Sequence, residues 1–320
     1  MIGADRLRIG VSLPTWGDAS GHQPGWSEIV RLAQLAEQAG IDTAWAPDHL
    51  LRRTASGRLV GFWECWTILA AVAASTTRIG IGPLVASLPF RQPGLLAKMA
   101  STLDEVSGGR LILGLGIGSP DFDATWEAFG YPTDRPAARA EEAAEIAVRL
   151  LRGETVTVEG AFHRTSGAVL VPAGPRPAGP PVWVGARRPR AFRLAARWAD
   201  AVNANVTLTD AASVAAAFAP IADACDAAGR DPSTLERTGY AIVRLTGAGA
   251  GEADRTDAIA GTPARVAERL HEIHRAGVSH MTCYVGGGPT GGRFPLLDEA
   301  GVEGMARVLE ELRRLEAGDA

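Results

Sequence analysis

The feature that most constrains the fold is the alternation of short apolar, β-branched segments with amphipathic helical segments along the chain. Each apolar segment predicts a strand, and each following segment has the 3.6-residue period of a helix. The predicted strands are residues 7–13, 41–47, 78–85, 110–115, 181–185, 200–204, 239–246 and 278–285. Near-continuous apolar strands alternating with helices predict a closed (β/α)8 TIM barrel, whose parallel strands are covered on both sides.

Residues that begin and end helices support this division. Gly40 follows the first helical segment, and Thr262 with Pro263 forms an N-cap followed by proline at the first helical position. Residues 153–180 break the rhythm and predict an inserted hairpin and loop. We therefore expect one barrel domain over 1–320 that contains this insertion. The predicted helices are residues 27–40, 62–74, 93–107, 136–152, 191–198, 211–228 and 262–276, with a last helix around 302–309.

An open doubly wound sheet is the alternative fold. The candidate for a dinucleotide fingerprint is Gly114-Leu-Gly116-Ile-Gly118, which lacks the G-x-G-x-x-G spacing and is followed by Pro120. These glycines either let a ligand approach the backbone closely or form a plain tight turn. The barrel is the better prediction.

Composition excludes several classes of protein. The 320 residues are 46% hydrophobic, enough for a full core, and the net charge of -4 lacks the basic surplus that nucleic-acid binding requires. We expect no membrane span, because no stretch reads as about 18 consecutive apolar residues, and no signal peptide, which predicts a cytoplasmic protein. Cys65, Cys225 and Cys283 are odd in number and far apart, so neither a disulfide framework nor a CxxC metal site is expected.

In a barrel of this kind the active site lies at the carboxyl ends of the strands. Asp48 and His49 follow the second predicted strand, where an imidazole can exchange a proton while a neighbouring carboxylate orients it. The alternative is an aspartate that caps local amides beside a packed histidine. We interpret the pair as catalytic.

Two further groups fall at the predicted mouth. Gly185, Ala186, Arg187 and Arg188 lead from a strand into a helix, where backbone amides and arginines suit a phosphate, although arginines at a helix start are usually just solvated. Tryptophan side chains are expected to line a pocket for a planar ring and to contact substrate. These are Trp16 and Trp63, with Trp126 as a further candidate.

The sequence gives no motif that would support a hydrolase or a metal site. The sequence contains no G-x-S-x-G elbow, Walker loop or HExxH. His271 and His274 have ligand-like i, i+3 spacing but belong to an outer helix without further zinc ligands nearby. We therefore predict no metal.

Four ordered segments resemble the luciferase-like monooxygenase superfamily, which includes FMN enzymes of the bacterial-luciferase type and oxidoreductases that use the 5-deazaflavin coenzyme F420. The segments are GIDTAWAPDHL, ECWTILAAVAASTTRIGIG, PFRQPGLLAKMASTLDEVSGGRLILGLGIGS and PPVWVGARRPRAFRLAARWADAVNAN. The similarity covers about residues 7–285 and is densest over 40–205.

The resemblance implies a barrel with an insertion after the fourth helix and a reduced FMN or F420 at the strand ends. His49 falls where members have an active-site histidine, and Asp48 precedes it as in the deazaflavin branch. Leu84-Val85 falls at a bulge where members often have a non-proline cis peptide behind the flavin ring. The implied cofactor contacts are Leu84, Val85, Gly116, Gly118, Ser119, Gly185, Ala186, Arg187 and Arg188.

The sequence also departs from the family pattern. Pro83 stands where threonine is common, and Ile117 and Ser119 stand where some branches carry a phosphate-binding arginine or a catalytic acid. Serine cannot replace that acid, which disfavours a sugar-phosphate dehydrogenase. Asp121 or Asp123 is the candidate replacement.

The resulting hypothesis is an oxidoreductase that uses reduced FMN or F420 to oxygenate or reduce a small organic substrate. His49 acts as general acid or base, and Asp48 helps to orient it. The resemblance implies a homodimer and a separate flavin or F420 reductase as partner. The rival hypotheses are a non-catalytic flavin carrier and a metal-dependent barrel hydrolase.

Overall fold

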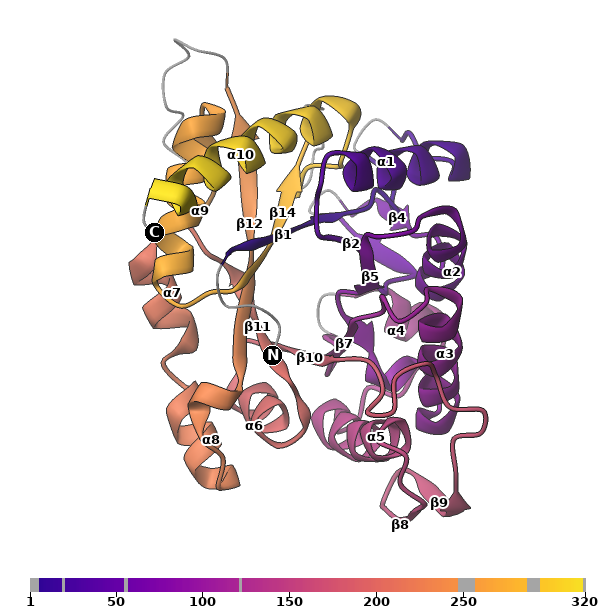
Figure 1. Ribbon diagram of the computed structural model, residues 1–320. Coiled ribbons are helices and arrows are strands. Elements are labelled where there is room, and N and C mark those ends of the chain that lie inside the picture. The colour runs from indigo at the N-terminus through magenta and orange to yellow at the C-terminus, as the bar shows by residue number, and fades with distance from the viewer. Residues whose placement is uncertain are drawn as a thin grey trace.

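The structure, a computed structural model, describes residues 6–18, 21–54, 57–120, 123–246, 257–286 and 294–318. Within these residues, parallel strands form a barrel with helices on its outside (Figure 1). Strand β1 pairs with both β2 and β14, and a single bridge between Ile81 of β5 and Leu111, just before β7, joins the two ends of the sheet. The predicted barrel is confirmed. Its strands are β1 (Arg8–Ser12), β2 (Thr43–Ala46), β5 (Gly80–Pro83), β6 (Ala86–Ser87), β7 (Leu113–Gly116), β10 (Val182–Ala186), β11 (Ala201–Thr207), β12 (Glu236–Leu245) and β14 (His280–Val285), with β13 (Ile259–Gly261) beside β12.

The helices follow the predicted segments closely. Thr262 caps its helix by accepting a hydrogen bond from the Arg265 amide, and Pro263 is the first helical residue, as expected. Glu64 and Gln92 cap two further helices in the same way. The helices are α1 (Trp26–Gln38), α2 (Cys65–Ser75), α3 (Pro93–Val106), α4 (Thr125–Ala128), α5 (Pro136–Leu151), α6 (Pro189–Trp198), α7 (Ala211–Phe218), α8 (Ile221–Ala228), α9 (Pro263–Arg275) and α10 (Glu299–Gly318), with single 3-10 turns at Leu88–Phe90 and Pro232–Thr234.

One predicted helix, residues 211–228, is wrong as a single element. It is split into α7 and α8 because Pro220 lies inside the apolar pattern and cannot donate a helical hydrogen bond. By length and composition alone, Ala211–Ala228 is apolar enough for a membrane span, a test that the core helices of soluble proteins also pass. The break between the two helices leaves neither half long enough to cross a bilayer.

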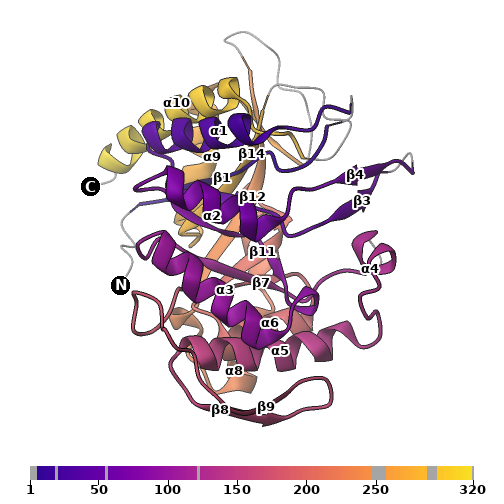
Figure 2. The same ribbon diagram turned by 90° about the vertical axis from the view of Figure 1, so that its right-hand side faces the viewer.

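Two antiparallel hairpins extend from the barrel. One consists of β3 (Leu51–Arg53) and β4 (Leu59–Gly61), between the predicted strand 41–47 and the predicted helix 62–74. The other consists of β8 (Val156–Glu159) and β9 (Arg164–Ala168), inside the predicted insertion. In Figure 2 both termini lie on the left, whereas β3, β4 and α4 project on the right, beyond the carboxyl ends of the strands.

Bulky side chains fill the inside of the barrel and form its floor. The rings of Trp45 and Trp183 are 5.0 Å apart, and His280 meets Trp183 edge-on. Burial lowers the pKa of His280 well below its usual value, so its ring is neutral and pairs with the Thr43 hydroxyl at 2.8 Å. A Cβ at Gly82 would overlap the Ile112 carbonyl, so only glycine fits beside this packing. A ligand therefore has no room in the middle of the barrel.

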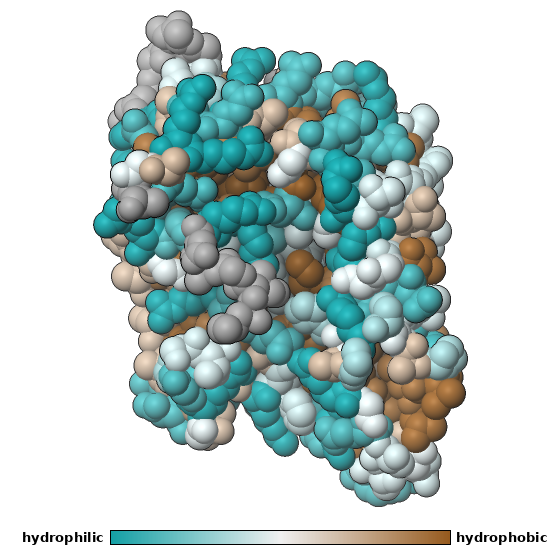
Figure 3. Space-filling view, in the orientation of Figure 1, coloured by the Kyte–Doolittle hydropathy of each residue, from teal (hydrophilic) through white to brown (hydrophobic). Residues whose placement is uncertain are grey.

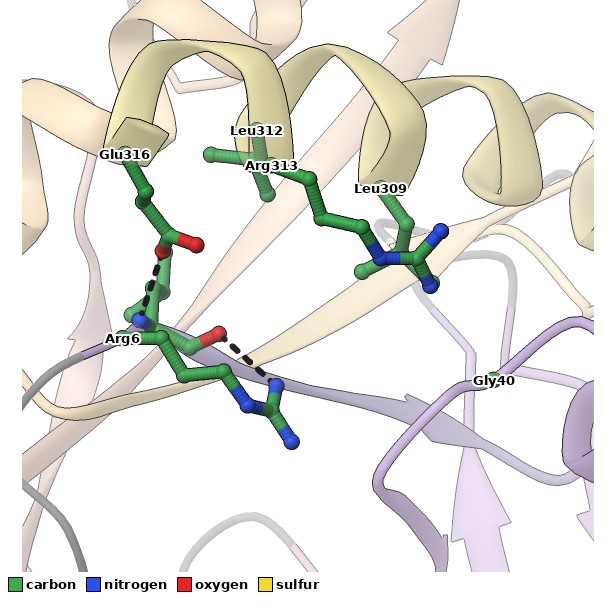
Figure 4. Close-up of a pocket in the computed structure, with 7 residues that line it drawn as sticks. Arg6, Gly40, Leu309, Leu312, Arg313 and Glu316 are labelled. Atoms are coloured by element: carbon green, nitrogen blue, oxygen red, sulfur yellow. Dashed lines mark hydrogen bonds between the residues drawn. The ribbon is translucent and has the colours of Figure 1, made fainter. Parts of the chain in front are cut away.

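The opposite, amino-terminal end carries a hollow of about 250 Å³ beside α10 (Figure 4). Its floor is closed by a hydrogen bond from the Leu7 amide to Glu316, and the guanidinium groups of Arg6 and Arg313 lie on its sides. Arg6 is paired with Asp42. Because TIM-barrel active sites lie at the other end, this hollow is not the candidate site.

Candidate active site

An aromatic wall stands on one side of the barrel mouth. Trp16, which follows β1, stacks on Phe62 with ring centroids 5.8 Å apart, and Phe62 in turn lies 5.3 Å from the His49 ring. The Trp63 indole instead donates a hydrogen bond to the Pro24 carbonyl at 2.7 Å. Of the two tryptophans predicted to contact substrate, Trp16 belongs to this wall, and Phe62 rather than Trp63 is its aromatic neighbour.

His49 is paired with a carboxylate from another part of the chain. Its Nδ1 lies 2.6 Å from Asp123 Oδ2, while 44% of the imidazole side chain remains exposed at the mouth. Burial by itself raises the pKa of the Asp123 carboxyl, but hydrogen bonds with His49 and Thr125 outweigh it and hold that pKa below its usual value. Asp123 therefore stays ionised and holds a proton on Nδ1, which leaves Nε2 to exchange a proton with a ligand.

The loop that carries Asp123 is tied to the segment that carries His49. Thr125 Oγ1 accepts hydrogen bonds from the amides of Leu50 and Leu51 and donates one to the Leu51 carbonyl. The Thr125 amide in turn donates to Asp123 Oδ1 at 2.9 Å. This clasp fixes both members of the pair. Asp123 was one of two candidate acids from the sequence; the other, Asp121, lies outside the described residues.

Asp48 does not orient His49, which corrects the sequence interpretation. Its fully buried carboxylate accepts two hydrogen bonds from Arg91, at 2.6 and 3.0 Å, and one from the Ser87 amide. Arg91 also pairs with Glu64. Successive residues of an extended segment point to opposite sides, so Asp48 points into the protein while its neighbour faces the mouth. Asp48 therefore joins the end of β2 to the segment after β6.

Glycines of β7 and β10 pack against Val85, which follows β5. The Leu84-Val85 peptide is cis, at the position that the family resemblance indicated. A Cβ on Gly116 would overlap Val85 Cγ2, and one on Gly185 would lie 3.3 Å from Val85 Cγ1. Val85 thus occupies the space that these glycines leave open. Gly118, with φ of 84°, turns the chain above Trp126, which is buried. Ser119 is exposed at the rim.

Replacing Gly116 by alanine should weaken binding of the cofactor that the family resemblance implies, without unfolding the protein. The added methyl displaces the Val85 side chain, against which we expect the ring to rest, and overpacking of this kind costs about 1–3 kcal/mol. Fluorescence titration with the cofactor measures the affinity, and circular dichroism checks the fold. Gly25→Ala is the matched control, because a Cβ there meets nothing within 4 Å. Unchanged affinity in Gly116→Ala would remove Gly116 from the site.

The turn between β10 and α6 has the features of an anion site. Arg188 is the N-cap of α6 without a side-chain capping bond, and Pro189 is the first helical residue. Arg187, Arg188 and Arg190 are exposed, and no carboxylate of the described residues pairs with them. Free amides at a helix start and unpaired guanidinium groups both favour a phosphate. Gly185 and the buried Ala186 bring the strand to this turn.

A second aromatic group, which the sequence reasoning did not single out, lies at β14 and β12, the strands that follow β1 around the barrel from His49's strand β2. The rings of Tyr240, Tyr284 and Phe294 lie within 4.5 to 5.7 Å of one another. Tyr240 and Tyr284 belong to the adjacent strands β12 and β14, on the faces directed into the barrel. The sequence could have predicted these residues, because side chains two apart on a strand point to the same face, here the inside of the barrel.

A metal site finds no support in the part of the chain that the structure covers. No group of three or more histidine, cysteine or acidic side chains is arranged to hold an ion there. His274 Nδ1 is hydrogen-bonded to the Val278 carbonyl, and its ring centroid is 6.5 Å from that of His271. All three cysteines are buried and free, as expected.

Comparisons with known proteins show which family the chain belongs to. A family model described as luciferase-like monooxygenase matches residues 7–246. The chain is 28% identical to a 5,10-methylenetetrahydromethanopterin reductase of Archaeoglobus fulgidus, over 82% of this chain and 90% of that protein. It is 34% identical to an F420-dependent hydroxymycolic acid dehydrogenase of Mycobacterium tuberculosis, over 71% of this chain and 62% of that one.

Solved structures show the same relationship. A monooxygenase from Streptomyces bottropensis superposes with a TM-score of 0.75 at 25% identity, covering 98% of this chain and 100% of that one. The matched region contains the barrel, the His49 segment and the turn before α6. The chain belongs to the luciferase-like monooxygenase family, whose members are oxidoreductases dependent on a flavin or on coenzyme F420.

Proposed function

We propose that this enzyme uses reduced coenzyme F420 to reduce a small organic substrate at the barrel mouth, and that it catalyses the reverse oxidation. The observation that carries the proposal is the exposed His49 paired with the buried Asp123. When bound, the deazaflavin supplies or accepts a hydride, and carbon at its position 5 suppresses reaction with oxygen. The F420-dependent dehydrogenase among the relatives supports this choice of cofactor.

The residues at the mouth fit such a group. Val85, over Gly116 and Gly185, backs a planar ring, and the amides and arginines at the start of α6 suit a phosphate. Leu84, Gly118, Ser119 and Ala186 complete the proposed contacts.

Residues of this chain carry out the proton transfer that accompanies the hydride transfer. His49 Nε2 gives a proton to the substrate atom that becomes an alcohol or amine, or takes it in the oxidation direction. Asp123 stabilises the protonated imidazole and fixes its orientation. Trp16 and Phe62 exclude water from this side of the site. Asp48 takes no part in the proton transfer; it ties the end of β2 to Ser87 and Arg91.

The proposal is tested by titrating the purified protein with F420 and, under anaerobic conditions, with reduced FMN. We expect F420 to bind in preference to FMN. Replacing Arg187 and Arg188 together by glutamine should weaken that affinity by tenfold or more, or about 1.4 kcal/mol. Arg197→Gln, at the far end of the same helix, is the control. Binding of neither cofactor would end the proposal.

A second candidate function is oxygenation with reduced FMN. The superposition on the Streptomyces bottropensis monooxygenase favours it. Tight binding of reduced FMN alone, with oxygen uptake in the presence of substrate, would replace the F420 proposal by this one. A separate flavin or F420 reductase would then supply the reduced cofactor in the cytoplasm, where we place the enzyme.

We also propose that the single barrel domain works as a homodimer that associates through the flank of α3. Helix α2 contains no charged residue, and Leu95 of α3 and Val171 are 54% and 74% exposed. Lys98 holds the Val171 carbonyl against α3 at 2.7 Å. Figure 3 shows apolar side chains gathered at the lower right, on the side of α3. Apolar patches of this kind mark protein interfaces.

Leu95→Glu should convert the dimer to a monomer, because an unpaired charge would be buried in the interface. Sedimentation velocity measures the change. Leu59→Glu, at a similarly exposed leucine on β4, is the control and should remain dimeric. A wild-type protein that sediments as a monomer would refute the proposed interface.

A further inference from the structure

Strand β12 carries an arginine to the rim of the mouth. The strand is ten residues long, and its end pairs with β13 at Val243, Arg244 and Leu245. A Cβ on Gly304 of α10 would overlap Leu245, which therefore faces the outer helices. Because side chains alternate along a strand, Arg244 lies on the other face, with Tyr240 and the inner side of the barrel.

Arg244 lacks a partner. Its Nε is buried, yet no hydrogen-bond acceptor contacts it, and no described carboxylate forms an ion pair with the side chain. Arg8 also has a buried Nε without an acceptor, but its guanidinium is paired with Glu236. A buried donor atom without an acceptor is costly, and a ligand anion that reached this partly exposed side chain would supply the missing acceptor.

An aromatic cluster precedes Arg244 along β12 on the same face. Ile242, two residues before Arg244, pairs in register with Tyr284 of β14. Arg244 thus lies about 7 Å further along β12, beyond the Tyr240–Tyr284–Phe294 cluster. Burial raises the pKa of the Tyr284 phenol, whereas a hydrogen bond with Ser12 and the charge of Arg52 act in the opposite direction. Arg52 therefore adds a second positive charge near the same phenol.

We propose that Arg244 and the Tyr240–Tyr284–Phe294 cluster form a substrate subsite for an anionic group, a carboxylate or a phosphate, attached to a planar apolar moiety. The cation pairs with the anion, and the rings pack against the apolar part. The inference rests on the proposed use of this mouth as the active site, and it names the class of substrate. The anionic tail of the cofactor is the other source of such a group, but the turn before α6, across β11 from β12, is the site we assign to it.

The test compares benzoate with benzamide, which have the same ring with and without the charge. Isothermal titration calorimetry is run on the cofactor-free protein and on the protein with F420. Wild type should bind benzoate at least tenfold more tightly than benzamide, and the preference should fall with added salt. Arg244→Gln should abolish the preference while leaving benzamide binding and the affinity for F420 unchanged.

Arg313→Gln is the matched control, because Arg313 is an exposed arginine at the opposite end of the barrel (Figure 4). It should retain the preference for benzoate. Equal binding of the two probes by wild type, or a preference that survives in Arg244→Gln, would overturn the subsite. A loss of F420 affinity in Arg244→Gln would reassign the arginine to the cofactor. Benzoate selectivity in a protein that fails to bind F420 would keep the subsite and end the proposed function.

Discussion

Replacing His49 by glutamine lowers kcat with F420 by about 100-fold to 10,000-fold, the range that a positioned general acid or base contributes. Glutamine keeps a hydrogen bond to Asp123 but cannot exchange a proton near neutral pH. Stopped-flow measurement of hydride transfer separates this loss from cofactor binding, which should change little. A His49→Gln enzyme with wild-type turnover would show that the proton comes from elsewhere.

The partner residue extends this prediction. Asp123→Asn should lower kcat less than His49→Gln does, because the imidazole is retained but its orientation and charge are no longer supported. Asp134→Asn is the control, since Asp134 is an exposed acid on the way to α5. The lowered pKa of Asp123 also determines how stability changes with pH. The ionised carboxylate stabilises the folded protein above the unfolded-state pKa near 4, and this stabilisation is lost as the pH falls through the lower folded-state pKa. The unfolding free energies of wild type and Asp123→Asn should therefore converge in acid.

The second large effect is on stability. Asp48→Ala should lower the free energy of unfolding by about 3–5 kcal/mol, the usual result of removing one member of a buried ion pair. The Asp48 side chain is fully buried and Arg91 is only 12% exposed, so water cannot replace the lost carboxylate. Urea unfolding followed by circular dichroism measures the change.

Two variants make this result specific. Asp48→Leu combined with Arg91→Met should recover part of the loss, because no unpaired charge is then buried. Glu303→Ala, which removes an exposed pair with Arg307, should change stability by no more than about 0.5 kcal/mol. If Asp48→Ala unfolds at the same urea concentration as wild type, the Arg91 pair does not hold the strand end in place.

The general architecture could be predicted from the sequence because the strands and helices of a barrel are determined by short stretches of sequence. Apolar runs, N-caps such as Thr262 and glycines at helix ends act within a few residues, and they placed the barrel and most of its helices. The failure at residues 211–228 was also local. The apolar pattern continues through Pro220 and therefore predicted one helix. In the structure the helix is interrupted at this proline.

The site was only partly predictable because its contacts join distant segments. His49 could be located by its position after a strand, but Asp123 lies 74 residues away, and nearness in sequence favoured Asp48. Neighbours on an extended chain point apart, which is why the adjacent acid was the wrong partner for the imidazole. The same rule separates Phe62 from Trp63.

The origin of the two partners in different βα units has a consequence for the life of the enzyme. His49 follows β2 and Asp123 follows β7, and the barrel strand formed by β5 and β6 lies between these two strands. A nascent or nicked chain in which β2 to β7 are not yet paired cannot bring His49 and Asp123 together, however well its individual helices form. The pair can therefore form once β2 to β7 are in place, before the later strands complete the ring.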